Sequence, residues 1–210
     1  MQNACEPLHI QLNLNDLKVT VLNRRYTPAS NLTAQIGVFD TGSKSLFREE
    51  AYFSMGPSEV RITESLEEVR EQNKGILFVV LNLKDQSGKT VSHNVYWLSP
   101  DNNYRTLKDI PPSSVSVSLL KTMKGDIDNN YTFRLTNNSG KIAFFLRSQL
   151  IIDDEEVLPS YWSSNYITLA PSESTTLSVV CPAARLKGRE PVIRISGWNV
   201  KGQDMKPGSR

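Results

Sequence analysis

Apolar and polar residues alternate with a period of two, in short runs, along most of the chain. Such alternation places successive side chains on opposite faces of a half-buried strand. In the first half it predicts seven strands, over residues 9–13, 18–22, 32–39, 47–53, 60–63, 76–83 and 90–97. Turn-forming residues separate these runs, as at Gly56-Pro57 and in Asp85-Gln86-Ser87-Gly88. Seven short strands separated by such turns are typical of an immunoglobulin-like sandwich.

One charged segment interrupts the alternation. Residues 64–74 (ESLEEVREQNK) are rich in helix formers, and Val69 is their only β-branched residue. We expect a single helical turn or a charged loop there.

The alternation stops between Ser99 and Pro112, where Pro, Asp and Asn accumulate. This composition predicts a linker over residues 100–112. The strand pattern then resumes over residues 115–120, 131–135, 143–152, 166–169, 175–180 and 192–198. We therefore predict an all-β protein with two tandem immunoglobulin-like β-sandwich domains, residues 1–99 and 113–210.

Length and charge indicate the number of domains and exclude some classes of binding partner. The chain has 210 residues, more than one average domain of about 100 to 150 residues. Its 24 basic and 22 acidic residues are evenly spread and give a net charge of +2, so we expect no binding to nucleic acid or to a membrane surface. No stretch approaches the roughly 20 apolar residues that span a bilayer. The N-terminus MQNACEP lacks the pattern of a signal peptide, so we expect any export signal to lie upstream.

The chain has two cysteines, Cys5 and Cys181, near its opposite ends. We expect two free thiols; a disulfide between them is the alternative, and so few cysteines leave the redox compartment open.

The polar residues do not assemble a catalytic or metal site. The only imidazoles, His9 and His93, alternate outward in the strand pattern, so we expect exposed positions and no triad. The acidic run Asp153–Glu156 fits a solvated turn better than a glycosidase acid pair. Residues 126–130 could hold a weak calcium ion, but a plain hairpin tip fits them better. We expect no catalytic residue, no cofactor and no metal in this chain.

Aromatic residues are the one feature that could bind a ligand, because rings stack on the apolar faces of sugars. Tyr161, Trp162 and Tyr166, together with Asn165, fall in or beside the irregular stretch 159–165, where a sandwich would place an accessible loop. These four residues are the candidate contact with a sugar or with a neighbouring domain; plain structural packing is the alternative. Trp97 and Trp198 end strands and are expected in a core or at a seam.

Several ordered strings resemble the C-terminal part of glycoside hydrolase family 2 enzymes. They are ACEPLH (4–9), NVYWL (94–98), AFFLR (143–147), VLPSYWSSNYITLAPSE (157–173) and SGWNV (196–200), and together they cover nearly the whole chain. The most similar branch contains exo-β-glucosaminidases, β-mannosidases and mannosylglycoprotein endo-β-mannosidases. Enzymes of this branch have a catalytic (β/α)8 barrel with two glutamates, followed by two further sandwiches.

The resemblance implies a non-catalytic accessory region of a glycosidase that acts on β-linked mannose or glucosamine glycans. Its implied partner is the barrel domain of the same parent chain, with carbohydrate as a further candidate ligand. It also implies a periplasmic or extracellular location. Neither catalytic glutamate can be placed on a residue of this chain, because no barrel pattern of alternating strands and helices occurs in it. A carbohydrate-binding module and a free-standing immunoglobulin-like surface protein are the alternatives.

Overall fold

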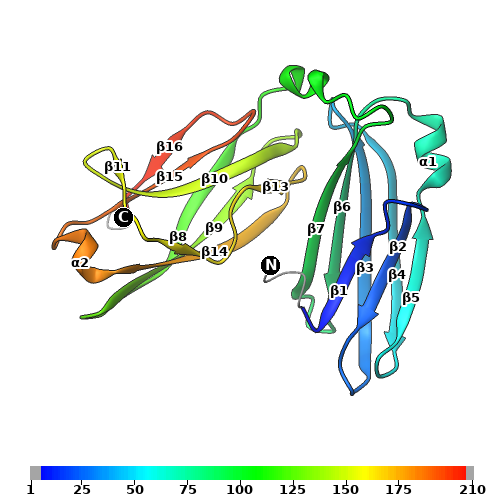
Figure 1. Ribbon diagram of the computed structural model, residues 1–210, viewed down its shortest axis with the longest axis horizontal. Helices are drawn as coiled ribbons and strands as arrows, with labels where there is room; N and C mark the ends of the chain where they lie inside the picture. Colours follow the sequence, from blue (N-terminus) through cyan, green and yellow to red (C-terminus); the bar gives the residue numbers. More distant parts are fainter. Residues whose placement is uncertain (1–5, 207–210) are drawn as a thin grey trace. The chain divides into compact units, whose positions relative to one another are not determined.

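A computed structural model describes residues 6–206, and the chain divides into two compact units between Ile110 and Pro111. Each unit is built almost entirely from β-strands, as Figure 1 shows, so the predicted all-β fold class is confirmed. The point of division lies inside the segment 100–112, where a short 3₁₀ helix, Arg105–Asp109, breaks the strand pattern. The two units are described separately.

The first unit contains two antiparallel sheets. One has three strands in the order β1-β2-β5, and the other has four in the order β4-β3-β6-β7. Their bounds are Leu8–Leu12 (β1), Lys18–Asn23 (β2), Ala29–Asp40 (β3), Ser45–Met55 (β4), Val60–Ser65 (β5), Leu77–Lys84 (β6) and Thr90–Leu98 (β7). All seven strands predicted for this half are present, each within three residues of its expected ends.

Alternating side chains of these strands form the core of the first unit. In β2, Val19 and Val21 are fully buried while Thr20 between them is half-buried, and β3 shows a similar alternation over most of its length. The core cluster also contains Ile10, Leu81 and Leu83. The charged segment forms one short helix, α1 (Glu67–Gln72), preceded by the buried Leu66.

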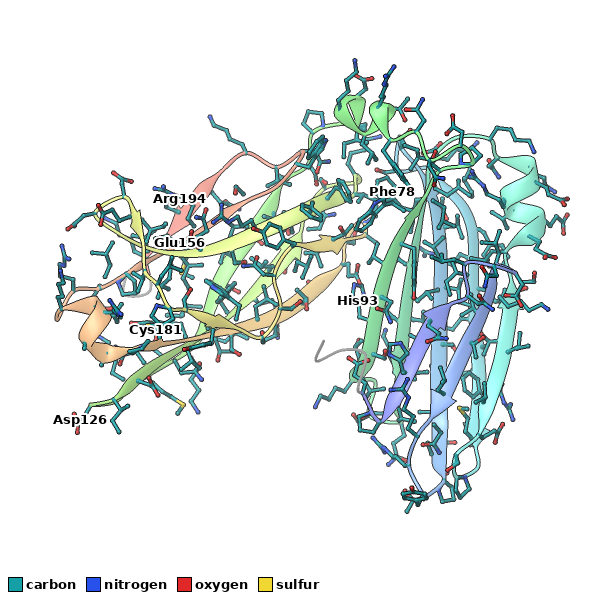
Figure 2. The ribbon with its side chains drawn as sticks, in the orientation of Figure 1. Phe78, His93, Asp126, Glu156, Cys181 and Arg194 are labelled. Carbon is teal, nitrogen blue, oxygen red and sulfur yellow. The ribbon has the colours of Figure 1, made fainter. Side chains whose placement is uncertain are left out.

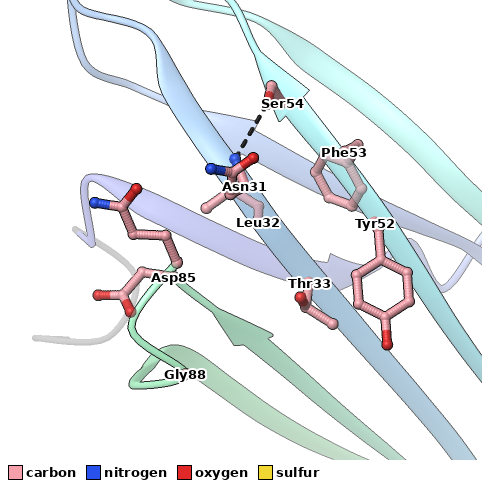
Figure 3. Close-up of a pocket in the computed structure, with 9 residues that line it drawn as sticks. Asn31, Leu32, Thr33, Tyr52, Phe53, Ser54, Asp85 and Gly88 are labelled. Carbon is pink, nitrogen blue, oxygen red and sulfur yellow. Dashed lines mark hydrogen bonds between the residues drawn. The ribbon is translucent and has the colours of Figure 1, made fainter.

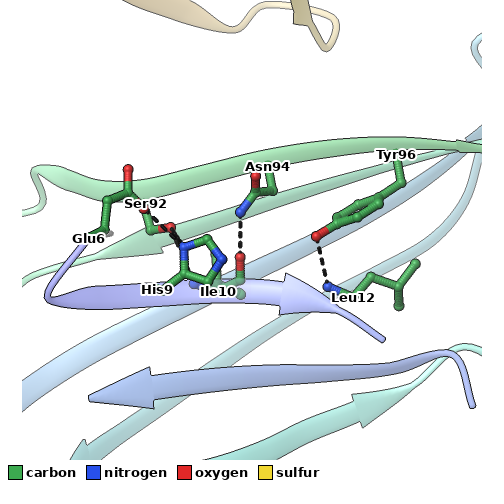
Figure 4. A network of polar contacts seen from close by, with 7 residues as sticks. All are labelled: Glu6, His9, Ile10, Leu12, Ser92, Asn94 and Tyr96. Carbon is green, nitrogen blue, oxygen red and sulfur yellow. Dashed lines mark hydrogen bonds and ion pairs between the residues drawn. The ribbon is translucent and has the colours of Figure 1, made fainter. Parts of the chain in front are cut away.

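Side chains of β7 join the two sheets of the first unit. The backbone N–H of Ile10 donates to Ser92 Oγ at 3.2 Å, and the N–H of Leu12 donates to the Tyr96 hydroxyl at 3.2 Å. Between them, Asn94 Nδ2 donates to the Ile10 carbonyl at 2.6 Å. Figure 4 shows these alternate residues of β7 reaching across to β1. Side-chain groups thus satisfy the outer edge of β1, where a neighbouring strand would otherwise pair.

The second unit also contains two sheets. One has the order β12-β14-β9-β8, and the other β11-β10-β15-β16, with β13 paired to β10. Their bounds are Val115–Lys124 (β8), Asp128–Asn137 (β9), Ala143–Ile152 (β10), Glu155–Glu156 (β11), Tyr161–Trp162 (β12), Ile167–Leu169 (β13), Ser174–Pro182 (β14), Val192–Ser196 (β15) and Gln203–Met205 (β16). A short helix, α2 (Ala183–Leu186), follows β14. The six predicted strands are present, and β11, β12 and β16 are additional short ones.

Two asparagines, one buried and one half-buried, fix the loops of the second unit. Asn137 is fully buried, and its Nδ2 donates to the carbonyls of Lys141, Leu169 and Ala170 at 2.7 to 3.1 Å. Asn199 Nδ2 donates to the carbonyls of Pro111 and Ile142, both at 2.7 Å. These side chains replace backbone partners that the loops lack.

Gly197, beside Asn199, is required by close packing. A Cβ atom added there would lie 2.8 Å from Leu146 Cδ2 and 3.1 Å from the Phe144 carbonyl oxygen. Asn199 Oδ1 also accepts from the Phe144 N–H at 2.9 Å, so this side chain fixes three backbone groups. The string SGWNV therefore combines a glycine that has no room for a side chain with an asparagine that holds the backbone around it.

Candidate functional site

The first histidine is buried, so its predicted exposed position is wrong. His9 Nδ1 lies 3.2 Å from Glu6 Oε2 and 3.4 Å from Ser92 Oγ (Figure 4). A Ser–His–acid triad needs the serine on one ring nitrogen and the carboxylate on the other, whereas both groups approach Nδ1 here. This trio therefore lacks the arrangement that relays a proton from a serine.

The second histidine is half-buried in β7. His93 Nδ1 lies 2.8 Å from Asn82 Oδ1 on the adjacent strand β6, which fixes the imidazole on the face of the sheet. His93 therefore acts as a cross-strand partner of Asn82 within the sheet.

The first two residues of the acidic run form an exposed turn between β10 and β11, as predicted, and the last two form β11. Asp153 and Asp154 both have left-handed φ angles and pair with Arg189 and Arg194, respectively. Arg194 also binds both carboxylate oxygens of Asp204, at 2.7 and 2.9 Å, which holds the pKa of Asp204 below its usual range. Exposed carboxylates that pair with arginines lack the desolvated surroundings that a general acid needs.

The last carboxylate of the run, Glu156, points to β10 rather than to its acidic neighbours. Its Oε2 accepts from Arg147 Nη2 at 2.7 Å and from Gln149 Nε2 at 2.9 Å. In the same unit, Asp126 lies at the tip of the hairpin between β8 and β9, as predicted (Figure 2). No group of three or more metal-binding side chains occurs within residues 6–206.

The candidate aromatic segment follows a cis Leu158–Pro159 peptide bond. Its middle is not a free loop, because Tyr161 and Trp162 form the short strand β12 against Val180 and Val179 of β14. The Trp162 ring packs edge-on against Phe133, with centroids 5.9 Å apart, and its Nε1 donates to Ser160 Oγ at 3.1 Å. Trp162 is therefore partly buried against the core of the second unit.

Asn165 behaves like a strand partner for β10. Its Oδ1 accepts from the Ser148 N–H at 2.8 Å, and its Nδ2 donates to the Ser148 carbonyl at 2.9 Å. Both polar atoms of the side chain thus take part in the fold and leave little hydrogen-bonding capacity for a sugar.

The two tyrosines of the segment are exposed, at 64% for Tyr161 and 51% for Tyr166. Tyr161 lies on the sheet with β14, whereas the Tyr166 ring contacts Phe145 of β10 at a centroid distance of 5.1 Å. β12 and β13 belong to different sheets, and among residues 6–206 no ring contact joins the two tyrosines, so their rings do not form one stacked platform.

Two tryptophans and one cysteine of the described chain can also be compared with their expected positions. Trp97 and Trp198 are 38% and 59% exposed, so neither belongs to a core. Cys181 is a buried free thiol, and desolvation raises its pKa. Cys5 lies outside the described residues, so the expectation for this cysteine is not tested.

The first unit has a cavity that the sequence pattern did not predict. It has a volume of about 460 Å³ and is lined by residues of β3, β4 and the β6–β7 turn, including Asn31, Tyr52, Asp85 and Gln86 (Figure 3). Tyr52 is 74% exposed. The signal for it was present: Glu50, Tyr52 and Ser54 alternate outward along β4, and an aromatic residue on the wet face of a strand is unusual.

Comparison with known proteins gives two family matches. Residues 94–200, just over half of the chain, match the family described as the exo-beta-D-glucosaminidase Ig-fold domain. Residues 15–101 match the family described as the mannosidase Ig/CBM-like domain.

Curated relatives and solved structures agree with these matches. The chain is 31% identical to an exo-beta-D-glucosaminidase of Streptomyces avermitilis, over 96% of this chain and 25% of that protein. It is 25% identical to a mannosylglycoprotein endo-beta-mannosidase of Lilium longiflorum, over 93% of this chain and 27% of that protein. The crystal structure of the exo-chitosanase CsxA of Amycolatopsis orientalis superposes with a TM-score of 0.84 and 29% identity, over 98% of this chain and 27% of that chain. The chain thus spans about a quarter of the length of the relatives it matches.

Proposed function

Because this chain belongs to the family of exo-β-D-glucosaminidase Ig-fold domains, we propose that it is the non-catalytic accessory region of a glycoside hydrolase family 2 enzyme. The parent enzyme would hydrolyse β-linked glucosamine glycans, with β-mannosides as the second substrate class. The partner of this region is then the catalytic (β/α)8 barrel of the same parent chain. We further propose a periplasmic or extracellular location, where polymeric glycans are met.

The observation that carries the proposal is the role of the family-like strings in the fold. Asn94 and Tyr96 join the two sheets of the first unit. Gly197 and Asn199 fix a tight packing contact and a loop in the second. In each of these strings the polar groups are used for the scaffold, which is what an accessory region requires and an active site does not.

The carboxylates support the same conclusion. Three of the four side chains of the acidic run Asp153–Glu156 pair with arginines. A glycosidase needs one carboxylic acid held protonated by a desolvated pocket, about 5 to 9.5 Å from a second one. Asp153, Asp154 and Glu155 are exposed and Glu156 is half-buried, so none of the four lies in such a desolvated pocket.

Two measurements test the proposal. The 210-residue chain should release no p-nitrophenol from p-nitrophenyl β-D-glucosaminide or β-D-mannoside above the buffer rate, and an enzyme-like rate would overturn a non-catalytic role. The source gene should encode, in frame and upstream of residue 1, a barrel with a glutamate at the ends of two strands. A start codon and promoter directly before residue 1 would instead favour a free-standing immunoglobulin-like protein.

A further inference from the structure

We propose that the cavity beside Tyr52 on the first unit binds a cationic amino sugar, a β-linked glucosamine unit of the polymer. This inference rests on the proposed function, because it takes the ligand class from the proposed substrate. It places glycan binding on the face of the β4-β3-β6-β7 sheet in the first unit, and not on the aromatic segment of the second.

Tyr52 supplies an open aromatic surface. It lies in β4 directly opposite Thr33 of β3, a residue too small to cover a phenol ring. Its ring is 74% exposed and stands among the polar residues of the outer sheet face (Figure 3). An exposed ring at the wall of a cavity can stack on the apolar C–H face of a pyranose, while polar groups at its rim take the hydroxyls.

A β-bulge places Asn31 at the end of this cavity. Between Ala29 and Leu32 of β3 the pairing with β4 contains one extra residue, and Asn31 has a left-handed φ of 53°. The Asn31 N–H donates to Ser54 Oγ at 3.1 Å, which fixes the bulge while its side-chain amide lines the cavity. Bulges that redirect a side chain are common beside binding sites.

The turn between β6 and β7 supplies the charge. Asp85 Oδ1 accepts from the N–H groups of Ser87 and Lys89, at 2.9 and 3.2 Å, and from Ser87 Oγ at 2.6 Å. All three hydrogen bonds go to Oδ1, so the Asp85 carboxylate is held in one orientation. The nine residues that line the cavity include this carboxylate and no lysine or arginine, and Lys89, outside the lining, is a positive charge near Asp85 that an ammonium ligand would have to displace or share.

This combination favours glucosamine over neutral sugars. Mannose and N-acetylglucosamine could use the Tyr52 ring and the amides of Asn31 and Gln86 equally well. Only the ammonium group of glucosamine adds an ion pair with Asp85. At an exposed site such a pair increases affinity by up to about fivefold, so we expect a preference of that size and millimolar binding.

The experiment follows amide chemical shifts of the ¹⁵N-labelled 210-residue chain during titration with three tetrasaccharides: β-1,4-glucosamine, its N-acetylated form and β-1,4-mannose. We expect saturable shifts at residues 31–33, 52–54 and 85–88, with the glucosamine tetramer binding most tightly. Added salt should weaken its binding and leave the other two unchanged.

Three variants sharpen the test. Tyr52→Ala should weaken all three ligands about two- to tenfold through loss of stacking. Asp85→Asn keeps an Oδ1 acceptor for Ser87 and Lys89, and it should remove only the preference for glucosamine. Tyr26→Ala is the matched control, because Tyr26 is 93% exposed and lies outside the cavity lining.

Absence of shifts at these residues with every tetramer at millimolar concentration would overturn the site, as would shifts confined to residues 161–166. Equal binding of the charged and neutral tetramers would overturn the ionic recognition by Asp85. None of these results bears on whether an upstream barrel is encoded, so failure of this inference is distinguishable from failure of the proposed function.

Discussion

The rings of Phe145 and Tyr166 lie in contact, 5.1 Å between centroids, and both residues have left-handed backbones with φ angles of 55° and 54°. A bulky residue in this region costs about 1 kcal/mol or more relative to an ordinary strand conformation. The Phe145 N–H donates to Thr168 Oγ1 at 3.3 Å, and the Tyr166 N–H donates to Asn165 Oδ1 at 3.0 Å. The aromatic contact and these two hydrogen bonds hold the strained junction of β10 and β13 together.

We therefore expect the two exposed tyrosines of this segment to differ. Tyr166→Ala removes the ring contact while keeping the left-handed backbone, and it should lower the free energy of unfolding by about 1 kcal/mol. Tyr161→Ala, with no ring contact among the described residues, should change it by about 0.5 kcal/mol or less. Urea unfolding followed by fluorescence gives both values, and equal losses would contradict this account.

Asn137 is expected to be the most sensitive polar residue of the second unit. Asn137→Ala leaves three backbone carbonyls without their donor in a buried site, which should cost about 2 to 4 kcal/mol. Its exposed neighbour offers a matched control, because Asn138→Ala should have almost no effect. Thermal unfolding of the two variants makes the comparison. Similar melting temperatures would show that the Asn137 hydrogen bonds contribute little.

Alkaline pH should destabilise the second unit through Tyr131. Desolvation raises the pKa of this buried hydroxyl to about 12, from about 10 in an unfolded chain. The folded state therefore keeps a proton that the unfolded state loses, and the stability falls as pH rises between these two values. The raised pKa of Cys181 adds a similar loss that begins at lower pH. Unfolding measured from neutral to alkaline pH should show a shallower decline for Tyr131→Phe, and an unchanged slope would count against this assignment.

The Ser92 hydroxyl is expected to act in the fold and not as a nucleophile. Ser92→Ala leaves the Ile10 N–H buried without its acceptor, which should lower the stability of the first unit by about 1 to 3 kcal/mol. The unaltered chain should gain no mass with a fluorophosphonate reagent, because His9 offers one nitrogen to both neighbours. A stoichiometric adduct at Ser92 would disprove this reading.

The sequence predicts the strands well because burial in a sandwich repeats every second residue. It fails at His9, since in β1 the residues Leu8, His9 and Ile10 are all buried, and alternation assumes one wet face. The cross-sheet role of Asn94 depends on a residue 84 positions away, and the contact of Asn137 with the Leu169 carbonyl depends on one 32 positions away. Such distant pairings leave no local periodicity to read.

The candidate site was only partly predictable for a similar reason. Aromatic residues at 161–166 are visible in the sequence, but the partners of Trp162 and Asn165 lie in β9 and β10. The cavity beside Tyr52 combines three segments that only the fold brings together. A ring on the wet side of a strand was the local signal that could have revealed it.

The side chains that β7 extends to β1 have a consequence for colloidal behaviour. An uncovered strand at the border of a sheet is a template on which foreign chains can polymerise. Here the side chains of Ser92, Asn94 and Tyr96 already occupy the backbone groups at this border. A strand from another molecule would have to displace them before it could form a backbone hydrogen bond with β1. This border of the sheet is therefore protected against fibril growth.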